Sequence, residues 1–157
     1  MLLAELFEAR DLLVHFDPSD KWESIHSLVQ HLVSAGKLDE SKFEAVLEAV
    51  LSRERSMSTG MENGIAIPHG KLPNLDRLHG FFARLNQPID FQAIDERPVD
   101  LIFVLLAPET AGADHLKALA RISRLLRDQG VCDKLRGTDS AEALFAILTE
   151  SEEDRAA

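Results

Sequence analysis

The sequence has a single cysteine, Cys132, among its 157 residues, and this scarcity excludes two common kinds of site. One cysteine cannot form a disulfide within the chain, and a zinc site built from cysteine ligands is excluded as well. A chain of this length buries about 68–70% of its unfolded surface, so it can hold a core without either kind of cross-link. A lone thiol fits a reducing compartment, and we expect Cys132 to be a small buried hydrophobic residue.

Positive charge is also scarce, since 17 lysines and arginines face 27 aspartates and glutamates, which gives a net charge of −10. This balance argues against nucleic acid as a partner, because binding to phosphates requires many lysine and arginine contacts. It suits partners that carry basic surfaces. The apolar start, residues 1–16, is interrupted by acidic residues and has no basic leader, so we expect neither a signal peptide nor membrane insertion. The expected location is the cytoplasm.

The first third of the chain predicts one strand and two helices. An apolar run at residues 12–16 precedes Asp17-Pro18 and indicates a strand that ends in a turn. Two capping boxes follow, and each opens a helix; the first helix stops at Gly36 and the second reaches about Arg53. The residues that define these helices are Asp20 and Glu23 with the face Trp22, Ile25, Val29 and Leu32, then Ser41 and Glu44 with the face Phe43, Val46, Leu47, Val50 and Leu51.

The rest of the chain alternates strands with helices. Residues 80–85 and 99–106 predict strands, and the second is nearly all apolar, as a strand buried on both faces would be. Three helical segments follow, and they are marked by Leu116, Leu119, Ile122 and Leu126 up to about Gly130, by residues 131–136, and by Asp139 with Glu142 through Leu148. We expect the acidic tail from about residue 150 to be frayed.

These elements predict an α/β fold. Helices before, between and after the strands favour a sandwich in which a mixed central β-sheet is covered by helices on both faces. We expect a single domain over residues 1–157, because domains usually run to ~100–200 residues.

The segment at residues 59–71, TGMENGIAIPHGK, carries the strongest indication of chemistry. Its three glycines let the backbone turn and approach a ligand closely, and Pro68 suits the end or edge of a strand. His69 would therefore project from a strand end into a site with little side-chain cover. An imidazole is largely neutral near pH 7 and can attack phosphorus without a separate base. From the residues alone, an ordinary surface histidine in a turn is also compatible with the pattern.

This segment resembles the active-site signature of the IIA components of the bacterial phosphoenolpyruvate-dependent phosphotransferase system, fructose–mannitol type. The similarity extends from about Leu12 to Leu148, which is nearly the whole chain. GIAIPHGK at residues 64–71, followed by PIDF at 88–91, AID at 93–95 and PVDL at 98–101, most resembles the nitrogen-regulatory branch. Sugar-specific members often have alanine where this chain has Gly70.

The resemblance implies roles for three residues. His69 matches the histidine that is phosphorylated in the family, with the ring nitrogen left open between the tele and pros positions. Arg53 matches an arginine that approaches the phosphoryl oxygens, and His115 matches a second histidine beside the first. Phosphoryl transfer develops negative charge on three equatorial oxygens, which an arginine fork suits better than an ammonium group. We therefore expect His69, His115 and Arg53 to form the catalytic site.

Each of the two supporting roles has an alternative. Arg53 could serve only as a cation at the C-terminal end of its helix, and Arg55 could replace it if the local backbone differs from the family pattern. His115 follows Asp114 at the start of a helix, where free N–H groups favour an anion, but it could also be an exposed residue without a role. A His69–His115 metal site would lack an evident third ligand, so we expect neither a metal nor a cofactor.

Other candidate residues are expected to have minor roles. His79 precedes a strand and could approach the site, while Met57 and Met61 could form apolar contacts with a docking protein. The histidines expected to be structural or surface residues are His15, His26 and His31.

These expectations describe a histidine phosphocarrier, an enzyme of phosphotransferase type. It would accept phosphate on His69 from an HPr-like protein charged by enzyme I, and would regulate partner proteins. A sugar-specific IIA component for sugar transport, passing its phosphate to a IIB component, is the alternative; phosphate transfer to a IIB domain would favour it. A third hypothesis, of another class, is a non-catalytic protein-binding module, which unchanged partner binding by a His69→Ala variant would favour.

Overall fold

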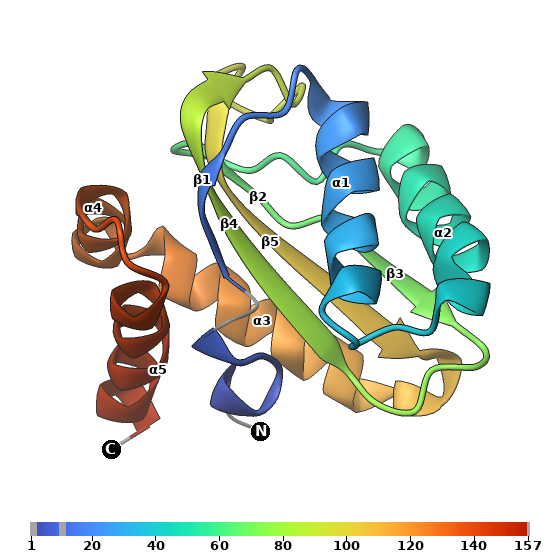
Figure 1. Ribbon diagram of the computed structural model, residues 1–157. Coiled ribbons are helices and arrows are strands. Elements are labelled where there is room, and N and C mark those ends of the chain that lie inside the picture. Colours follow the sequence, from blue (N-terminus) through green and yellow to red (C-terminus); the bar gives the residue numbers. More distant parts are fainter. Residues whose placement is uncertain (1–2, 10–11, 157) are drawn as a thin grey trace.

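A mixed five-stranded sheet forms the middle layer of the computed structural model, which describes residues 3–9 and 12–156 (Figure 1). Its strands are β1 (Leu13–Phe16), β2 (Ile65–Ala66), β3 (His69–Leu72), β4 (His79–Ile89) and β5 (Val99–Pro108). β4 and β5 pair antiparallel, whereas β1 pairs parallel with β4, and β2 and β3 both pair parallel with β5. β2 and β3 therefore follow one another along the same side of β5.

Helices cover both faces of the sheet. α1 (Lys21–Ser34) and α2 (Phe43–Ser56) lie on one face, while α3 (Ala113–Arg127), α4 (Gln129–Gly137) and α5 (Ala141–Ala156) lie on the other (Figure 1). Short 3-10 helices lie at Leu3–Glu5, Glu40–Lys42 and Glu109–Ala111. This arrangement confirms the predicted α/β sandwich with a mixed sheet between two helical layers.

β5 lies between two hydrophobic cores, because its side chains alternate between the two faces. Ile102, Val104 and Leu106 pack with α1 and α2, whereas Leu101, Phe103 and Leu105 pack with α3, α4 and α5. All six side chains are at most 1% exposed, and full burial of each such side chain contributes about 1.5–3 kcal/mol. Burial on both faces explains why this strand is nearly all apolar, as predicted.

Short polar side chains cap α1, α4 and α5, though only one predicted cap is correct. Asp20 caps α1 by accepting a hydrogen bond from a first-turn N–H at 2.8 Å. Before α2, Asp39 accepts the N–H of Ser41, and α2 itself has no side-chain cap, so the predicted cap at Ser41 is wrong. α5 is capped by Ser140, not by Asp139. Asp and Ser both cap well, so a neighbouring one can replace the predicted residue.

Two predicted helix faces are correct except at their first residue. Trp22 is 42% exposed, and Lys21 takes the buried position on α1. Leu116 is 66% exposed, and His115 takes the buried position on α3. The predictions assigned the apolar residue to the core, because lysine and histidine are seldom fully buried without a specific reason.

Two helices also run further than predicted. α2 ends at Ser56 instead of Arg53, and α5 continues to Ala156 instead of ending at Leu148. The backbone of the acidic tail is thus helical and not frayed at residue 150. The sequence after Leu148 contains neither glycine nor proline, the residues that most strongly disfavour a helix.

Candidate functional site

Two short strands place His69 at the side of β5. β2 and β3 pair with β5 in succession, and Pro68 between them accepts a hydrogen bond from Leu105 N at 3.0 Å. Gly70 lies against α2, where an added Cβ would come within 3.3 Å of Val50 Cγ2. Because successive side chains of a strand point to opposite faces, His69 points toward the face that α3 covers.

The start of α3 brings His115 against His69. Their ring centroids are 5.7 Å apart, and the ring planes are inclined at 51°. His115 is only 4% exposed and His69 is half-buried. The alternative of an exposed side chain at position 115 is therefore wrong, and the two histidines share one site.

Hydrogen bonding decides which nitrogen of His69 carries the proton. Nδ1 lies 2.8 Å from the carbonyl oxygen of Ile67. A carbonyl oxygen can only accept, so Nδ1 donates, and Nε2 of the neutral ring keeps its lone pair. At His115, Nδ1 is buried and has no hydrogen-bond partner among the residues that the structure describes.

Burial keeps both rings neutral near pH 7. It lowers the pKa of His69, an effect that the Ile67 carbonyl and the Glu54 carboxylate oppose and the Arg53 charge reinforces. The pKa of His115 is lowered to about 4, first by burial and then by the neighbouring His69 and Lys71. A neutral His69 with a free lone pair on Nε2 is chemically a nucleophile.

Of the two candidate arginines, only Arg53 acts on His69. Its charge contributes to the lowered pKa of His69, and its Nη1 donates to the carbonyl oxygen of Met57 at 2.8 Å. Arg55 instead forms an exposed ion pair with Glu48 at 3.1 Å. The hydrogen bond to Met57 also ties the end of α2 to the loop beyond it, so Arg53 has a structural contact besides its position near the histidine.

His79 lies on the opposite face of the sheet from His69. Its Nε2 donates to Asp76 Oδ1 at 3.1 Å. In the sheet His79 is the partner of Leu106, which packs with α1 and α2, whereas the partner of His69 is Leu105, which packs with α3. The structure therefore does not bring His79 into the site.

The other histidines make local contacts. His15 is exposed on β1, and His26 is exposed with its ring edge-on to Phe43 at 5.4 Å between centroids. His31 is partly buried, with its ring 4.8 Å from that of Phe81, so the prediction of a surface residue is wrong there.

The two methionines near the glycine-rich segment differ in exposure. Met57 is 69% exposed, whereas Met61 is partly buried and packs against the core beneath α3. Cys132 is buried, as predicted, and its Sγ donates to the carbonyl oxygen of Leu126 at 3.0 Å. Burial raises the pKa of the Cys132 thiol, so it is a structural residue and not a reactive one.

Two charged residues near the histidines, Lys71 and Glu54, had no predicted role. Lys71 lies two positions after His69 on β3 and so on the same face, where its charge reaches His115. The alternation of side chains along a strand could have indicated Lys71, because residues two positions apart lie on the same face. Glu54 is 2% exposed and acts electrostatically on His69. No pattern in the sequence marks one acidic residue of an amphipathic helix as buried.

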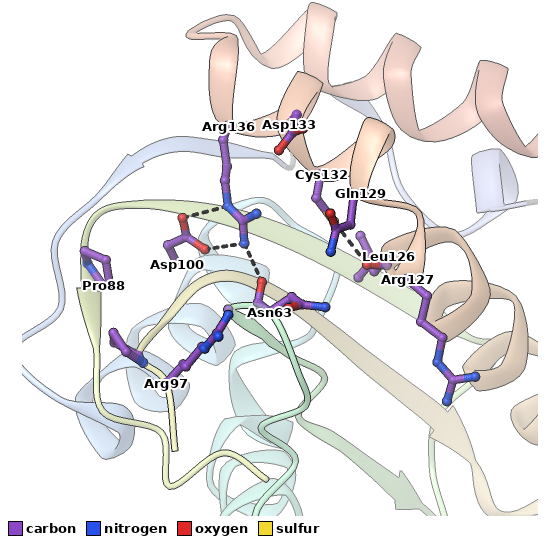
Figure 2. A pocket seen from close by; sticks show the side chains of 12 residues that line it. Asn63, Pro88, Arg97, Asp100, Leu126, Arg127, Gln129, Cys132, Asp133 and Arg136 are labelled. Atoms are coloured by element: carbon purple, nitrogen blue, oxygen red, sulfur yellow. Dashed lines mark hydrogen bonds and ion pairs between the residues drawn. The ribbon is translucent and has the colours of Figure 1, made fainter. Parts of the chain in front are cut away.

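A cavity of about 370 Å³ lies at the C-terminal end of α3, away from the two histidines. Figure 2 shows Arg136 of α4 reaching toward Asp100 and the backbone of Asn63. Arg136 Nε and Nη2 donate to the Asp100 carboxylate, each at 2.9 Å, and Nη2 also donates to Asn63 O at 2.6 Å. An added Cβ on Gly64, whose φ is +81°, would lie 2.7 Å from Arg136 Nη2. This ion pair therefore braces the turn that leads into β2 and on to His69.

No helix in the described part of the chain is both long and apolar enough to span a bilayer. The described residues also contain no group of three or more histidine, cysteine, aspartate or glutamate side chains placed to hold a metal ion. The two histidines alone offer fewer protein ligands than the three or four that a zinc site uses.

Over residues 5–151 the chain matches the family described as "Phosphoenolpyruvate-dependent sugar phosphotransferase system, EIIA 2", and it belongs to this family. A nitrogen regulatory protein of Bradyrhizobium diazoefficiens is 52% identical over 132 residues, which cover 83% of this chain and 86% of that protein. A fructose-specific EIIA component of Haloferax volcanii is 37% identical over 133 residues, 85% of each chain. The crystal structure of the nitrogen regulatory protein IIA-Ntr of Neisseria meningitidis matches with a TM-score of 0.86 at 31% identity, over 94% of this chain and 99% of that one. The predicted family is confirmed, and the relatives include both its regulatory and its sugar-specific members.

Proposed function

We propose that this chain is a histidine phosphocarrier of the nitrogen-regulatory type, which accepts a phosphoryl group on His69 from an HPr-like protein charged by enzyme I. The observation that carries the proposal is the fixed tautomer of His69, whose Nδ1 donates to Ile67 O and whose Nε2 is left as the nucleophile. The 52% identity to a nitrogen regulatory protein supports the regulatory branch. The family match over residues 5–151 supports a single IIA domain that works in the cytoplasm.

The transfer is an exchange of one phosphorus–nitrogen bond for another. The Nε2 lone pair of His69 attacks the phosphorus of the donor's phosphohistidine, and the breaking bond returns its electron pair to the donor ring. His69 then carries a proton on Nδ1 and phosphorus on Nε2, so its ring is cationic. The Ile67 carbonyl, 2.8 Å from Nδ1, stabilises that charge through its hydrogen bond. The product would be the Nε2, or tele, phosphohistidine.

We expect three side chains to act on the phosphoryl oxygens. Arg53 supplies a guanidinium fork from the end of α2, and Lys71 supplies a second cation from β3. His115 has a ring 5.7 Å from that of His69 and a buried Nδ1 without a partner in the described chain. A neutral His115 can donate one ring N–H to an oxygen on His69 without the repulsion between two cations.

The test is phosphorylation in a purified system. The chain is incubated with phosphoenolpyruvate, enzyme I and the HPr-like carrier, and the intact mass and acid lability of the product are measured. We expect one acid-labile phosphoryl group on the native chain and none on His69→Ala, with a ³¹P signal typical of the Nε2 isomer. Phosphorylation of the alanine variant at the native rate would refute the assignment of His69.

The second candidate is a sugar-specific IIA component that passes its phosphate to a IIB component. The 37% identity to a fructose-specific EIIA component favours it. Rapid and stoichiometric transfer from phosphorylated His69 to a purified IIB domain would support this function over the regulatory one.

A further inference from the structure

A buried ion pair lies behind the nucleophile, between the two helices on the other face of the sheet. Lys21 Nζ at the start of α1 is 3.1 Å from Glu54 Oε2 in the last turn of α2. The lysine side chain is 5% exposed and the glutamate side chain is not exposed at all. Charges at such depth are unfavourable unless further hydrogen bonds satisfy them. The partners of this pair therefore indicate what it does.

Besides Lys21, Glu54 binds the start of the glycine-rich segment. Its Oε2 accepts from Thr59 N at 2.8 Å, and its Oε1 accepts from Thr59 Oγ1 at 2.5 Å. Lys21 Nζ reaches the loop after β4, where it donates to Phe91 O at 3.2 Å and to Gln92 Oε1 at 3.1 Å. The pair thus fixes Thr59 and the neighbouring loop with bonds to charged groups, which are stronger than neutral ones.

Two further hydrogen bonds connect Thr59 to the nucleophile. Thr59 O accepts from Ile67 N at 3.2 Å, and Ile67 O accepts from His69 Nδ1 at 2.8 Å. A series of contacts therefore runs from Lys21 through Glu54, Thr59 and Ile67 to His69, and it holds the backbone of Thr59 and Ile67 in place. The Ile67 carbonyl is the group that decides the His69 tautomer.

We propose that Glu54 and Lys21 are positioning residues, which hold Thr59 and Ile67 so that His69 keeps its proton on Nδ1 and presents Nε2. The inference rests on the proposed phosphocarrier function for its effect on transfer, but its effect on the tautomer does not depend on any partner. A pair that only stabilised the fold would leave both properties unchanged.

The variants separate charge, hydrogen bonding and folding. Glu54→Gln keeps the shape and removes the charge. Lys21→Met combined with Glu54→Gln removes both charges, so that no buried ion is left unpaired. Glu48→Gln is the matched control, because Glu48 lies on the same helix and makes only an exposed ion pair, with Arg55 at 3.1 Å.

Thr59 provides an independent test of the same link. Thr59→Val removes the hydroxyl that donates to Glu54 and keeps the N–H, whereas Thr59→Ser keeps both donors. If this series of contacts acts through Thr59, the serine variant should behave as the native chain does and the valine variant should not. The two Thr59 variants also test the proposal if both variants at Glu54 fail to fold.

The readouts are the ¹⁵N chemical shifts of the His69 ring and the single-turnover rate of phosphoryl transfer. In the native chain we expect one tautomer with the proton on Nδ1. In Glu54→Gln, in the double variant and in Thr59→Val we expect a mixture of tautomers and transfer slowed about tenfold, a factor equivalent to ~1.4 kcal/mol. Glu48→Gln and Thr59→Ser should match the native chain in both readouts.

The outcomes distinguish this inference from the proposed function. Native ring shifts and native transfer rates in the folded Glu54 and Thr59→Val variants would overturn the positioning role. Absence of phosphorylation on the native chain would overturn the phosphocarrier function, while the ring shifts would still decide whether Glu54 controls the tautomer.

Discussion

Replacing Arg53 with lysine tests the charge chemistry of the site most directly. Lysine keeps the positive charge that acts on His69, but it lacks the planar fork that binds two oxygens at once. It also removes the hydrogen bond from Arg53 Nη1 to Met57 O, which is 2.8 Å long. The variant therefore loses one contact expected in the transition state and one contact present in the free protein.

These two losses have different magnitudes and different observables. A hydrogen bond to a charged group contributes about 1.5–3 kcal/mol, so losing one made only in the transition state slows transfer by roughly one to two decades. The bond to the Met57 carbonyl also has a charged donor, but it is exposed to solvent, so its loss should cost only about 0.5–1.5 kcal/mol of folding stability. Transfer should therefore fall much more than stability does.

The assay is single-turnover transfer from the phosphorylated HPr-like carrier, with urea denaturation measured on the same samples. Arg55→Lys is the control, because Arg55 lies two residues away with a side chain 55% exposed and paired only with Glu48. Exposed pairs contribute about 0–1 kcal/mol, so the control should transfer at close to the native rate. A native rate in Arg53→Lys, or equal slowing in both variants, would refute the catalytic role of Arg53.

Four further outcomes follow from the geometry. The transfer rate should fall at low pH with a midpoint below 6.5, because burial lowers the pKa of His69; a midpoint above 6.5 in the pH–rate profile would contradict a buried nucleophile. Because His115 has a pKa of about 4 when folded and 6.5 when unfolded, protonation favours the unfolded chain as pH falls between these values. The free energy of unfolding of the native chain should therefore fall by about 2 kcal/mol from pH 7 to pH 5 because of His115. Urea titrations of His115→Gln at the same two pH values should show a loss that is smaller by this amount. Gly36→Ala, at φ +75° in open space, should cost about 1 kcal/mol of stability, whereas Gly64→Ala, at φ +81° against Arg136, should cost at least twice that; equal costs would show that the contact is unimportant. Phosphorylation adds about −1.5 to −2 charges to a chain with a net charge of −10, so it should weaken at least one regulatory partner roughly 5–150-fold in titrations at low and high salt; equal affinities would favour the sugar-transfer function.

Local patterns predicted most of the fold. The nearly all-apolar run that forms β5 predicted a strand buried on both faces, and Asp20 with Glu23 marked the start of α1 correctly. The failures involve buried polar residues. Lys21 is buried because Glu54, distant in the sequence, meets it in space, and that meeting depends on how α1 packs against α2. The sequence pattern therefore predicts Trp22 as the buried residue, whereas Lys21 is the buried one.

In the site, too, the sequence predicted some features, while others depend on tertiary packing. His69 stood out from its glycine-rich surroundings and from the family resemblance, and the resemblance favoured Arg53, but the residues alone could not exclude Arg55. The packing of α2 on Gly70 separates them, since it brings one arginine within electrostatic reach of the nucleophile and leaves the other paired on the surface. Which nitrogen of His69 keeps its lone pair depends on the position of the Ile67 carbonyl oxygen. No side-chain pattern in the sequence predicts that position.

That main-chain oxygen also makes the chemistry durable under mutation. Many histidines are oriented by a carboxylate, and a single codon change can delete such an acceptor. Here the acceptor is the carbonyl of residue 67, which persists whatever side chain the position carries. Substitutions around it can displace the oxygen and slow the reaction, but none can remove it. As substitutions accumulate in evolution, the rate of phosphoryl transfer should therefore change well before the nitrogen that we propose to carry the phosphate, Nε2 of His69, does.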